Sequence, residues 1–159
     1  MSSRAKRPIR LPTLKPRNLA TNSMSSELIA HIGIAVADLE KSIRAFESLS
    51  GRKIEAITDV PHQKVRVAML GGHDTARIEL VAATSPDSSI ARFIKKRGEG
   101  LHHVCIYVDD LEKRLRELKA AGVRLIDEQP RVGADGAKIA FVHPSGAGGV
   151  LVELQEKSI

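Results

Sequence analysis

Two histidines and two glutamates occupy matched places in two stretches of the chain. Residues 31–43 read HIGIAVADLEKSI and residues 103–115 read HVCIYVDDLEKRL, so that seven of thirteen positions are identical at a constant offset of 72. His31 and His103 open these stretches. Further on, Arg77-Ile-Glu-Leu corresponds to Leu151-Val-Glu-Leu. The likeness indicates one unit of about 50 residues used twice, with a histidine near its start and a glutamate (Glu79 or Glu153) near its end.

The alternation of side chains along a strand decides where these four groups point. In HIGIAV the apolar Ile32 and Ile34 share the face that packs on a helix, so His31 points to the other face. The same reasoning selects His103 over His102, which is expected on the opposite face in a structural role. Glu79 and Glu153 are each flanked by apolar residues and are also predicted to face away from the helices.

Such an arrangement predicts a metal site. A carboxylate within an apolar strand is costly unless it has a partner, and a pseudo-twofold axis brings all four groups together. A single histidine or glutamate on a strand is more often structural or solvent-facing, but four at repeat-related positions favour ligation. The set His31, Glu79, His103 and Glu153 suits one divalent ion, with Co²⁺ preferred and Mn²⁺, Ni²⁺ or Zn²⁺ as alternatives.

The elements that must position these residues read as strand, helix and three strands in each half. Asp38 and Asp110 are predicted helix N-caps, and Leu39, Ile43, Phe46 and Leu49 form the apolar stripe of the first helix. The later strands are expected near 52–58, 64–70 and 76–82, and then near 123–128, 138–143 and 149–155. The fold class is therefore α+β, with two βαβββ units forming a cupped, pseudo-twofold mixed sheet that carries helices on its outer face.

The chain is predicted to be one domain preceded by a tail. Repeat 1 spans about 28–82, a linker helix lies within 83–100, repeat 2 spans about 101–156, and together they form a single domain over 27–159. Residues 1–26 form a basic, proline-containing segment that is expected to be disordered; it resembles a transit peptide or marks translation starting at Met24. The location is accordingly predicted to be the cytoplasm, or the mitochondrial matrix if the tail is a transit peptide.

Composition excludes several function classes. The net charge of +6 comes from this tail, because the remaining 19 basic and 19 acidic residues balance, so no nucleic-acid partner is expected. Aromatic residues make up 3% and tryptophan is absent, which leaves little for stacking on bases. No apolar run is long enough to span a bilayer, and no membrane partner is expected. The single cysteine, Cys105, forms no internal disulfide and is expected to be a core side chain.

The repeated unit with its histidine and glutamate residues resembles the vicinal oxygen chelate superfamily, which includes glyoxalase I and the bleomycin-resistance proteins. Within it, residues 28–156 are most similar to the methylmalonyl-CoA epimerase family, in HIGIAVADLEKSI, DSSIARFIKKRGEGLHHVCIYVDDLE, GVRLIDEQPRVGADGAKIAFVHP and GGVLVEL. The resemblance implies His31, Glu79, His103 and Glu153 as metal ligands. It also implies an acyl-CoA substrate whose (R) and (S) forms are interconverted in propionyl-CoA metabolism, and a homodimer. Glu153 and Glu79 are the expected base and acid.

Two departures from the family pattern affect the substrate site. Val67 stands where some members carry a catalytic glutamate, and Ser145 stands where many carry a lysine. The candidate substrate-binding residues are Gln63, Arg131, Lys138, His143 and Ser145. Two alternative functions remain: a lactoylglutathione lyase of the glyoxalase I type, and a non-catalytic binding protein of the bleomycin-resistance type.

Overall fold

The computed structural model describes residues 28–71 and 76–157; the predicted tail, residues 1–26, lies outside them. The first half contains β1 (Ile29–Val36), α1 (Leu39–Ser50), β2 (Ile54–Val60), β3 (Val65–Leu70) and β4 (Arg77–Ala83). A linker helix, α2 (Ser89–Arg97), follows. The second half contains β5 (Gly100–Val108), α3 (Leu111–Ala120), β6 (Arg131–Val132), β7 (Lys138–Val142) and β8 (Val152–Glu156). Short 3₁₀ turns lie at Pro61–Gln63 and Pro144–Gly146.

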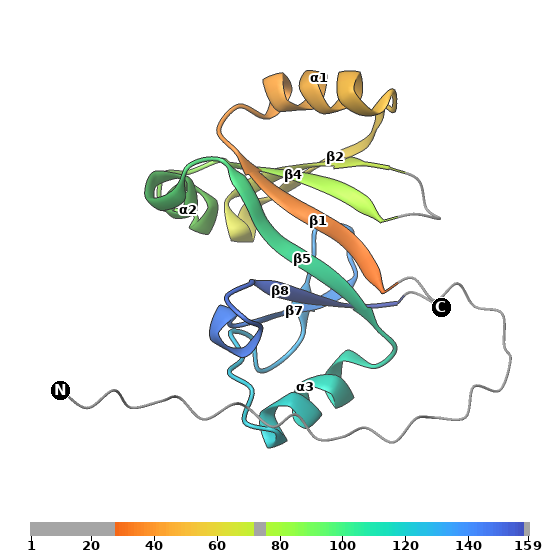
Figure 1. Cartoon of the computed structure of the whole chain (residues 1–159), viewed down its shortest axis with the longest axis vertical. Helices are drawn as coiled ribbons and strands as arrows, with labels where there is room; N and C mark the ends of the chain where they lie inside the picture. The colour runs from red at the N-terminus through yellow and green to blue at the C-terminus, as the bar shows by residue number, and fades with distance from the viewer. Residues whose placement is uncertain (1–27, 72–75, 158–159) are drawn as a thin grey trace, which may run out of the picture.

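All eight strands join one sheet, in which the strands of the second half repeat, outward from the centre, the order of the strands of the first half. The order is β2-β3-β4-β1-β5-β8-β7-β6. The antiparallel pair β1–β5 forms the centre, and each of these strands has a parallel neighbour, β4 or β8, from its own half. In Figure 1 these two strands run diagonally across the middle, with one half above and the other below. The predicted α+β fold of two repeated units in a mixed sheet is confirmed.

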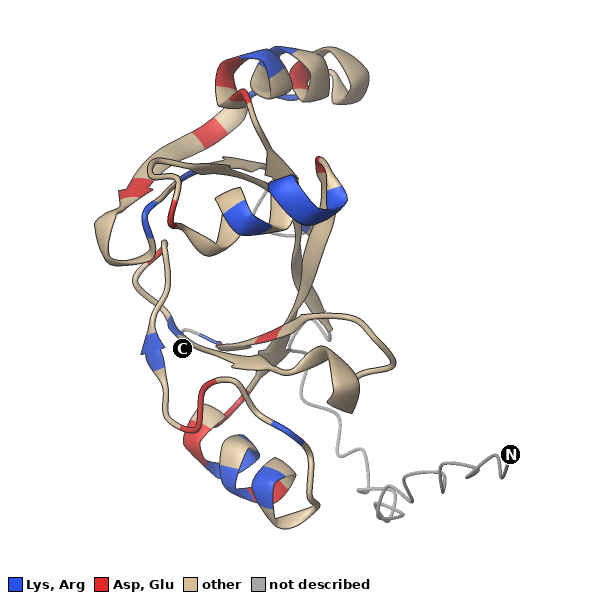
Figure 2. Ribbon diagram, turned by 90° about the vertical axis from the view of Figure 1, so that its left-hand side faces the viewer, with Lys and Arg blue, Asp and Glu red and all other residues tan. Residues whose placement is uncertain are grey.

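The sheet curls so that α1 and α3 lie on its outer face. Leu39 of α1 packs with Leu80 and Ala68 of the first half, and Leu111 and Leu115 of α3 pack with Ala140 of the second. Figure 2 shows these helices at the two ends of the curled sheet. The helices begin where predicted, because the carboxylates of Asp38 and Asp110 accept the N–H of the third residue beyond them.

Two details of helix packing differ from expectation. Leu49, assigned to the apolar stripe of α1, is 82% exposed, and Leu39 is the residue of this helix that is buried. The linker helix α2 packs on the inner face of the first half, where Ile90 contacts Val67 and Val81. It therefore helps to build the inside of the cup rather than its outer layer.

The strand predicted near 123–128 is wrong. Only Leu125 forms an isolated bridge, to Val142, and β6 is a two-residue strand further along the chain. Ile126 and Asp127 both donate their N–H to the carbonyl of Phe141, so the backbone bulges and regular pairing stops. The Asp127 carboxylate then accepts the Phe141 N–H at 2.8 Å in place of a backbone carbonyl.

Within the described residues, no helix is long and apolar enough to cross a membrane.

Replacing Asp127 by alanine is expected to destabilise the protein by roughly 1–3 kcal/mol, because the Phe141 N–H loses its acceptor within a half-buried segment. Urea unfolding should report this loss. Asp127→Asn keeps an acceptor oxygen and should restore most of the stability. Glu128→Ala is the matched control, since the neighbouring Glu128 makes only a surface ion pair with Lys119. Equal losses for Asp127→Ala and Glu128→Ala would contradict this account.

Candidate metal centre and its cavity

The four predicted ligands meet at one buried point. His31, Glu79, His103 and Glu153 are 4–7% exposed. The Nε2 atoms of His31 and His103 are 3.1 Å apart, and Nε2 of His103 lies 3.3 Å from Glu79 Oε2 and 3.2 Å from Glu153 Oε2. Nε2 of His31 lies 3.7 and 3.9 Å from the same two oxygens. Donor atoms from four strands therefore lie within 3.1–3.9 Å of a histidine Nε2, and those of His31, Glu79 and His103 all lie within 4.8 Å of one another.

Strand register explains the convergence. Gly33 in β1 is paired with Glu79 in β4 and with His103 in β5, so these three residues form one row across the sheet. Cys105 in β5 is paired with His31 in β1 and with Glu153 in β8, forming a second row. Each row brings a histidine of one half next to the glutamate of the other.

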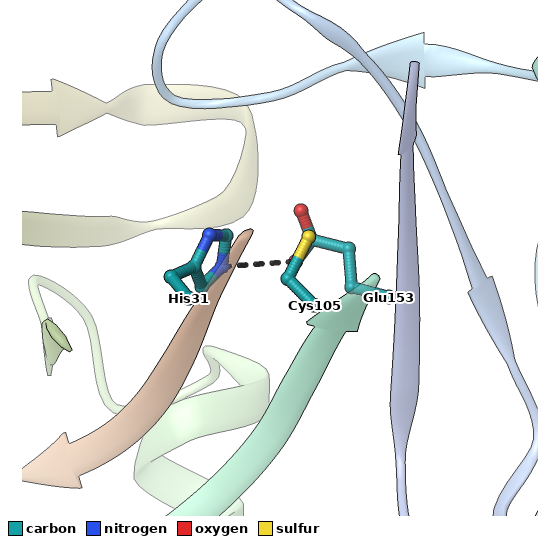
Figure 3. A group of neighbouring side chains, drawn as sticks. All are labelled: His31, Cys105 and Glu153. Carbon is teal, nitrogen blue, oxygen red and sulfur yellow. Dashed lines mark ion pairs between the residues drawn. The ribbon is translucent and has the colours of Figure 1, made fainter. Parts of the chain in front are cut away.

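The middle residues of the two rows differ. A Cβ added to Gly33 would lie 2.1 Å from Cε1 of His103, so the missing side chain makes room for that ring. In the other row Cys105 places a thiol beside His31 and Glu153, as Figure 3 shows. Cys105 is fully buried, as predicted for a core residue, and donates to Gln155 Oε1 at 3.5 Å. Burial, assisted by the nearby carboxylates, raises the pKa of the thiol far above its usual range.

Burial also shifts the titration of the other groups. It lowers the pKa of His31 to about 4, and it raises the pKa of Glu79 to about 7. Burial pulls the pKa of His103 down too, but the hydrogen bond with Glu153 and the charge of Glu79 outweigh it and raise that pKa. Charge is thus costly at this point of the protein unless a cation offsets the carboxylates.

The donor set fits a divalent cation. Ligand bonds of about 2.0–2.2 Å place neighbouring donors roughly 3 Å apart, close to the shorter separations among these four groups. Each imidazole presents Nε2, and each carboxylate presents one oxygen. The Nδ1 atom of His31 is buried without a hydrogen-bond partner among the described residues, so that ring gains its main polar interaction through Nε2.

Strand parity predicted that His102 points to the opposite face, and this prediction is wrong. Gly33 of β1 pairs with His103 of β5, but the next residue, Ile34, pairs with Leu101. His102 is therefore the extra residue of a β-bulge. A bulge re-aims its side chains. The Nδ1 atoms of His102 and His103 lie 3.0 Å apart, and His102 lines the same cavity as the ligand set. Burial lowers the pKa of His102 to about 4.

Glu79, His103 and Glu153 of this set line a cavity of about 770 Å³, counting the part continuous with solvent, whereas His31 lies behind its wall. Its apolar wall includes Val67 and Phe141. Gln63 and Arg131 reach this cavity from opposite halves. The Arg131 guanidinium lies 5.0 Å from the centre of the Phe141 ring, and its Nε lies 3.2 Å from Asp127 Oδ2.

Three other candidate substrate residues are absent from that lining. Lys138 is exposed and pairs with Glu112 and Glu156 on the outer side. His143 and Ser145 contact each other at 2.8 Å at the 3₁₀ turn after β7. The alternation that faces Ile139 to the cavity turns Lys138 away from it, and the strand ends before His143.

A polar contact between the halves was not foreseen from the sequence. Asp135, in the loop before β7, accepts a hydrogen bond from Gln155 Nε2 at 2.6 Å, and Arg77 Nη2 lies 3.9 Å from the same oxygen. Residues 133–137 close a turn through the Gly133 N–H and the Ala137 carbonyl. This turn spans from the second half of the sheet to the first beside the ligand set.

Comparison with known proteins agrees with this geometry. The family model of the glyoxalase/bleomycin resistance protein/dioxygenase superfamily matches residues 30–141. The chain is 37% identical over 127 residues to the mitochondrial methylmalonyl-CoA epimerase of Bos taurus, covering 79% of this chain and 72% of the relative. The chain belongs to the methylmalonyl-CoA epimerase family of this superfamily.

Solved structures support that assignment. A methylmalonyl-CoA epimerase in complex with methylmalonyl-CoA and NH₄⁺ superimposes with a TM-score of 0.78 at 32% identity, covering 82% of this chain and 94% of that one. The lactoylglutathione lyase of Haemophilus influenzae is more distant, at 29% identity over 122 residues, covering 74% of this chain and 86% of the relative.

The titration of Glu79 predicts how metal-free protein depends on pH. The folded protein keeps the Glu79 proton up to about pH 7, whereas the unfolded chain releases it near 4.5. Stability is therefore lost as the pH rises from about 4.5 to 7, by roughly 3 kcal/mol. In chelator, Glu79→Gln should be more stable than the parent at pH 8, and the difference should vanish below pH 4.5.

Urea unfolding of both proteins between pH 4 and 8 measures this difference. Glu55→Gln serves as control, because Glu55 is exposed on β2. A difference that stays constant with pH would show that Glu79 does not titrate as described.

Proposed function

We propose that this protein is a metal-dependent epimerase that interconverts (R)- and (S)-2-methylmalonyl-CoA through an enolate, in propionyl-CoA metabolism. The observation that carries the proposal is the meeting of two carboxylates and two imidazoles from opposite halves of the sheet, three of which, Glu79, His103 and Glu153, line one cavity. The relatives of the chain supply the substrate class. Such an enzyme would act in the cytoplasm, or in the mitochondrial matrix if residues 1–26 are a transit peptide.

The proposed ligands of the cation are His31, Glu79, His103 and Glu153. We take Co²⁺ as the preferred ion. Mn²⁺, Ni²⁺ and Zn²⁺ are alternatives, because nitrogen and carboxylate donors suit all four ions. When bound, the cation supplies Lewis-acid polarisation of the substrate's carbonyl and carboxylate oxygens. Two imidazoles and two carboxylates leave coordination positions for those oxygens.

We propose that the two carboxylates transfer protons on opposite faces of the substrate. The C2 proton of a malonyl thioester lies between two carbonyl groups and is therefore acidic. Epimerisation requires its removal on one face and its return on the other. Glu153 comes from β8 and Glu79 from β4, on opposite sides of the central strands, so we assign them as the base and acid pair.

Two wall residues are proposed to orient the substrate. The Arg131 guanidinium faces the cavity beside Phe141 and offers donors to a carboxylate or thioester oxygen. Gln63, at the end of the 3₁₀ turn after β2, offers an amide from the other half. Lys138, His143 and Ser145 lie off the cavity lining, so they are not part of this assignment.

Solvent exchange in D₂O tests the two-carboxylate mechanism. The parent should epimerise each methylmalonyl-CoA isomer and place deuterium at C2. Glu153→Gln should lose epimerisation by roughly 10²–10⁴-fold, while deuterium still enters one isomer through Glu79. Chelation should abolish both processes, and added Co²⁺ should restore them in the parent.

Controls separate the proposal from its alternatives. Glu117→Gln alters a carboxylate on α3 that pairs with Arg114 at the surface and should leave exchange unchanged. Full activity of Glu153→Gln, or exchange that persists without metal, would refute the mechanism. Turnover of the methylglyoxal–glutathione hemithioacetal alone would favour the lyase, and a purified protein without metal or exchange would favour the binding protein.

We further propose that the protein forms a homodimer. Leu101 and Val150 are 74% and 46% exposed and lie with Ile32 along one apolar groove beside the central strands. A second copy would cover this surface. Sedimentation should give a dimer for the parent and a monomer for Leu101→Lys, while Ile57→Lys, at an exposed position of β2, should remain dimeric. A monomeric parent would contradict the proposal.

A further inference from the structure

The two imidazoles of the ligand set differ in what holds their second nitrogen. Nδ1 of His103 lies 3.0 Å from Nδ1 of His102. Nδ1 of His31 is buried and has no hydrogen-bond partner among residues 28–71 and 76–157. Two residues that are equivalent by the repeat are therefore supported unequally.

The cause is a pair of β-bulges related by the same repeat. In the antiparallel pair of β1 and β5, each strand has one residue that is left unpaired at a bulge. This extra residue is Ala30 in β1 and His102 in β5. Each extra residue directly precedes a proposed ligand. In the first half the bulge supplies only a methyl group, whereas in the second half it supplies an imidazole.

We propose that His102 is a positioning residue: its Nδ1 accepts a hydrogen bond from the Nδ1–H of His103 and so holds Nε2 of His103 free and aimed at the cation. The inference rests on the metal site proposed above. It assigns His102 no contact with the substrate and no proton transfer.

The geometry of His103 fixes which nitrogen carries the proton. Its Nε2 lies 3.1–3.3 Å from His31 Nε2 and from both carboxylates, so Nε2 is the atom that meets a cation. A neutral imidazole that ligates through Nε2 carries its proton on Nδ1 and needs an acceptor there. The acceptor within hydrogen-bond distance is Nδ1 of His102.

The surroundings of His102 hold that acceptor in place. The ring of Phe93, on α2, packs edge-on against His102, with centroids 4.9 Å apart and an interplanar angle of 83°. The Gly33 position leaves the space that the His103 ring occupies. Loss of a hydrogen-bond partner that orients a metal-ligating histidine typically weakens metal affinity by about 10–100-fold.

Cobalt titration of the full-length, chelator-treated protein tests the inference by calorimetry. His102→Ala should weaken Co²⁺ binding by roughly 10–100-fold. His102→Asn should bind within a few-fold of the parent, because the Asn Oδ1 takes the place of Nδ1 and accepts the same hydrogen bond. His62→Ala is the matched control: His62 is an exposed histidine in the turn after β2 and its loss should not change affinity.

A second measurement does not depend on a variant that folds. In the Zn²⁺-bound parent, nitrogen-15 NMR of the histidine side chains should show a proton on Nδ1 of His103 and none on Nδ1 of His102. A proton on Nδ1 of His102 would overturn the inference.

The outcomes distinguish the inference from the proposed function. Equal affinity of the parent and His102→Ala would overturn the role of His102 and leave the metal site standing. Equal weakening in the alanine and asparagine variants would exclude the acceptor role. A parent that binds no Co²⁺, Mn²⁺, Ni²⁺ or Zn²⁺ would overturn the metal site itself, and with it the purpose assigned to His102.

Discussion

The constraint on which this structure depends is the burial of two carboxylates against the same imidazole. Glu79 and Glu153 each approach Nε2 of His103 within 3.3 Å, at a point where water is nearly excluded. Placing like charges there is unfavourable without a counter-ion, as the raised pKa of Glu79 reflects. The central pairing of β1 with β5 and the two parallel neighbours serve to bring these groups together.

Duplication makes the site and also makes it unsymmetrical. The repeat supplies each half with one histidine and one glutamate, and the two rows of paired residues are related by the pseudo-twofold axis. Where the halves differ, the differences lie next to the ligands: Gly33 corresponds to Cys105, and Ala30 corresponds to His102. His31 is therefore packed against a thiol, and its Nδ1 has no hydrogen-bond partner in the described part of the chain, while His103 lies over a glycine beside a second imidazole.

The sequence alone predicted the repeat, the faces of β1 and β8 and the convergence of the four ligands, because each follows from a period of two along a strand. The same rule failed at His102, since a bulge adds a residue and shifts parity without leaving a mark in the local sequence. The prediction of a strand at residues 123–128 also failed. Its apolar alternation is real, but the hydrogen bond from the Phe141 N–H to the Asp127 side chain replaces a backbone ladder that only tertiary structure reveals.

The apolar wall at Val67 determines which residues can transfer the proton in the proposed mechanism. Among the described residues that line the cavity, the carboxylates are Glu79 and Glu153, and both are proposed ligands. If a valine stands where a separate base would be placed, the ligand set must also move the proton. A carboxylate bound to a cation would be a weaker base, so in the proposed mechanism the one that moves the proton would have to be free of the cation. Without a cation, burial raises the pKa of Glu79 to about 7, so a Glu79 free of the cation would gain and lose a proton at similar free energy near neutral pH.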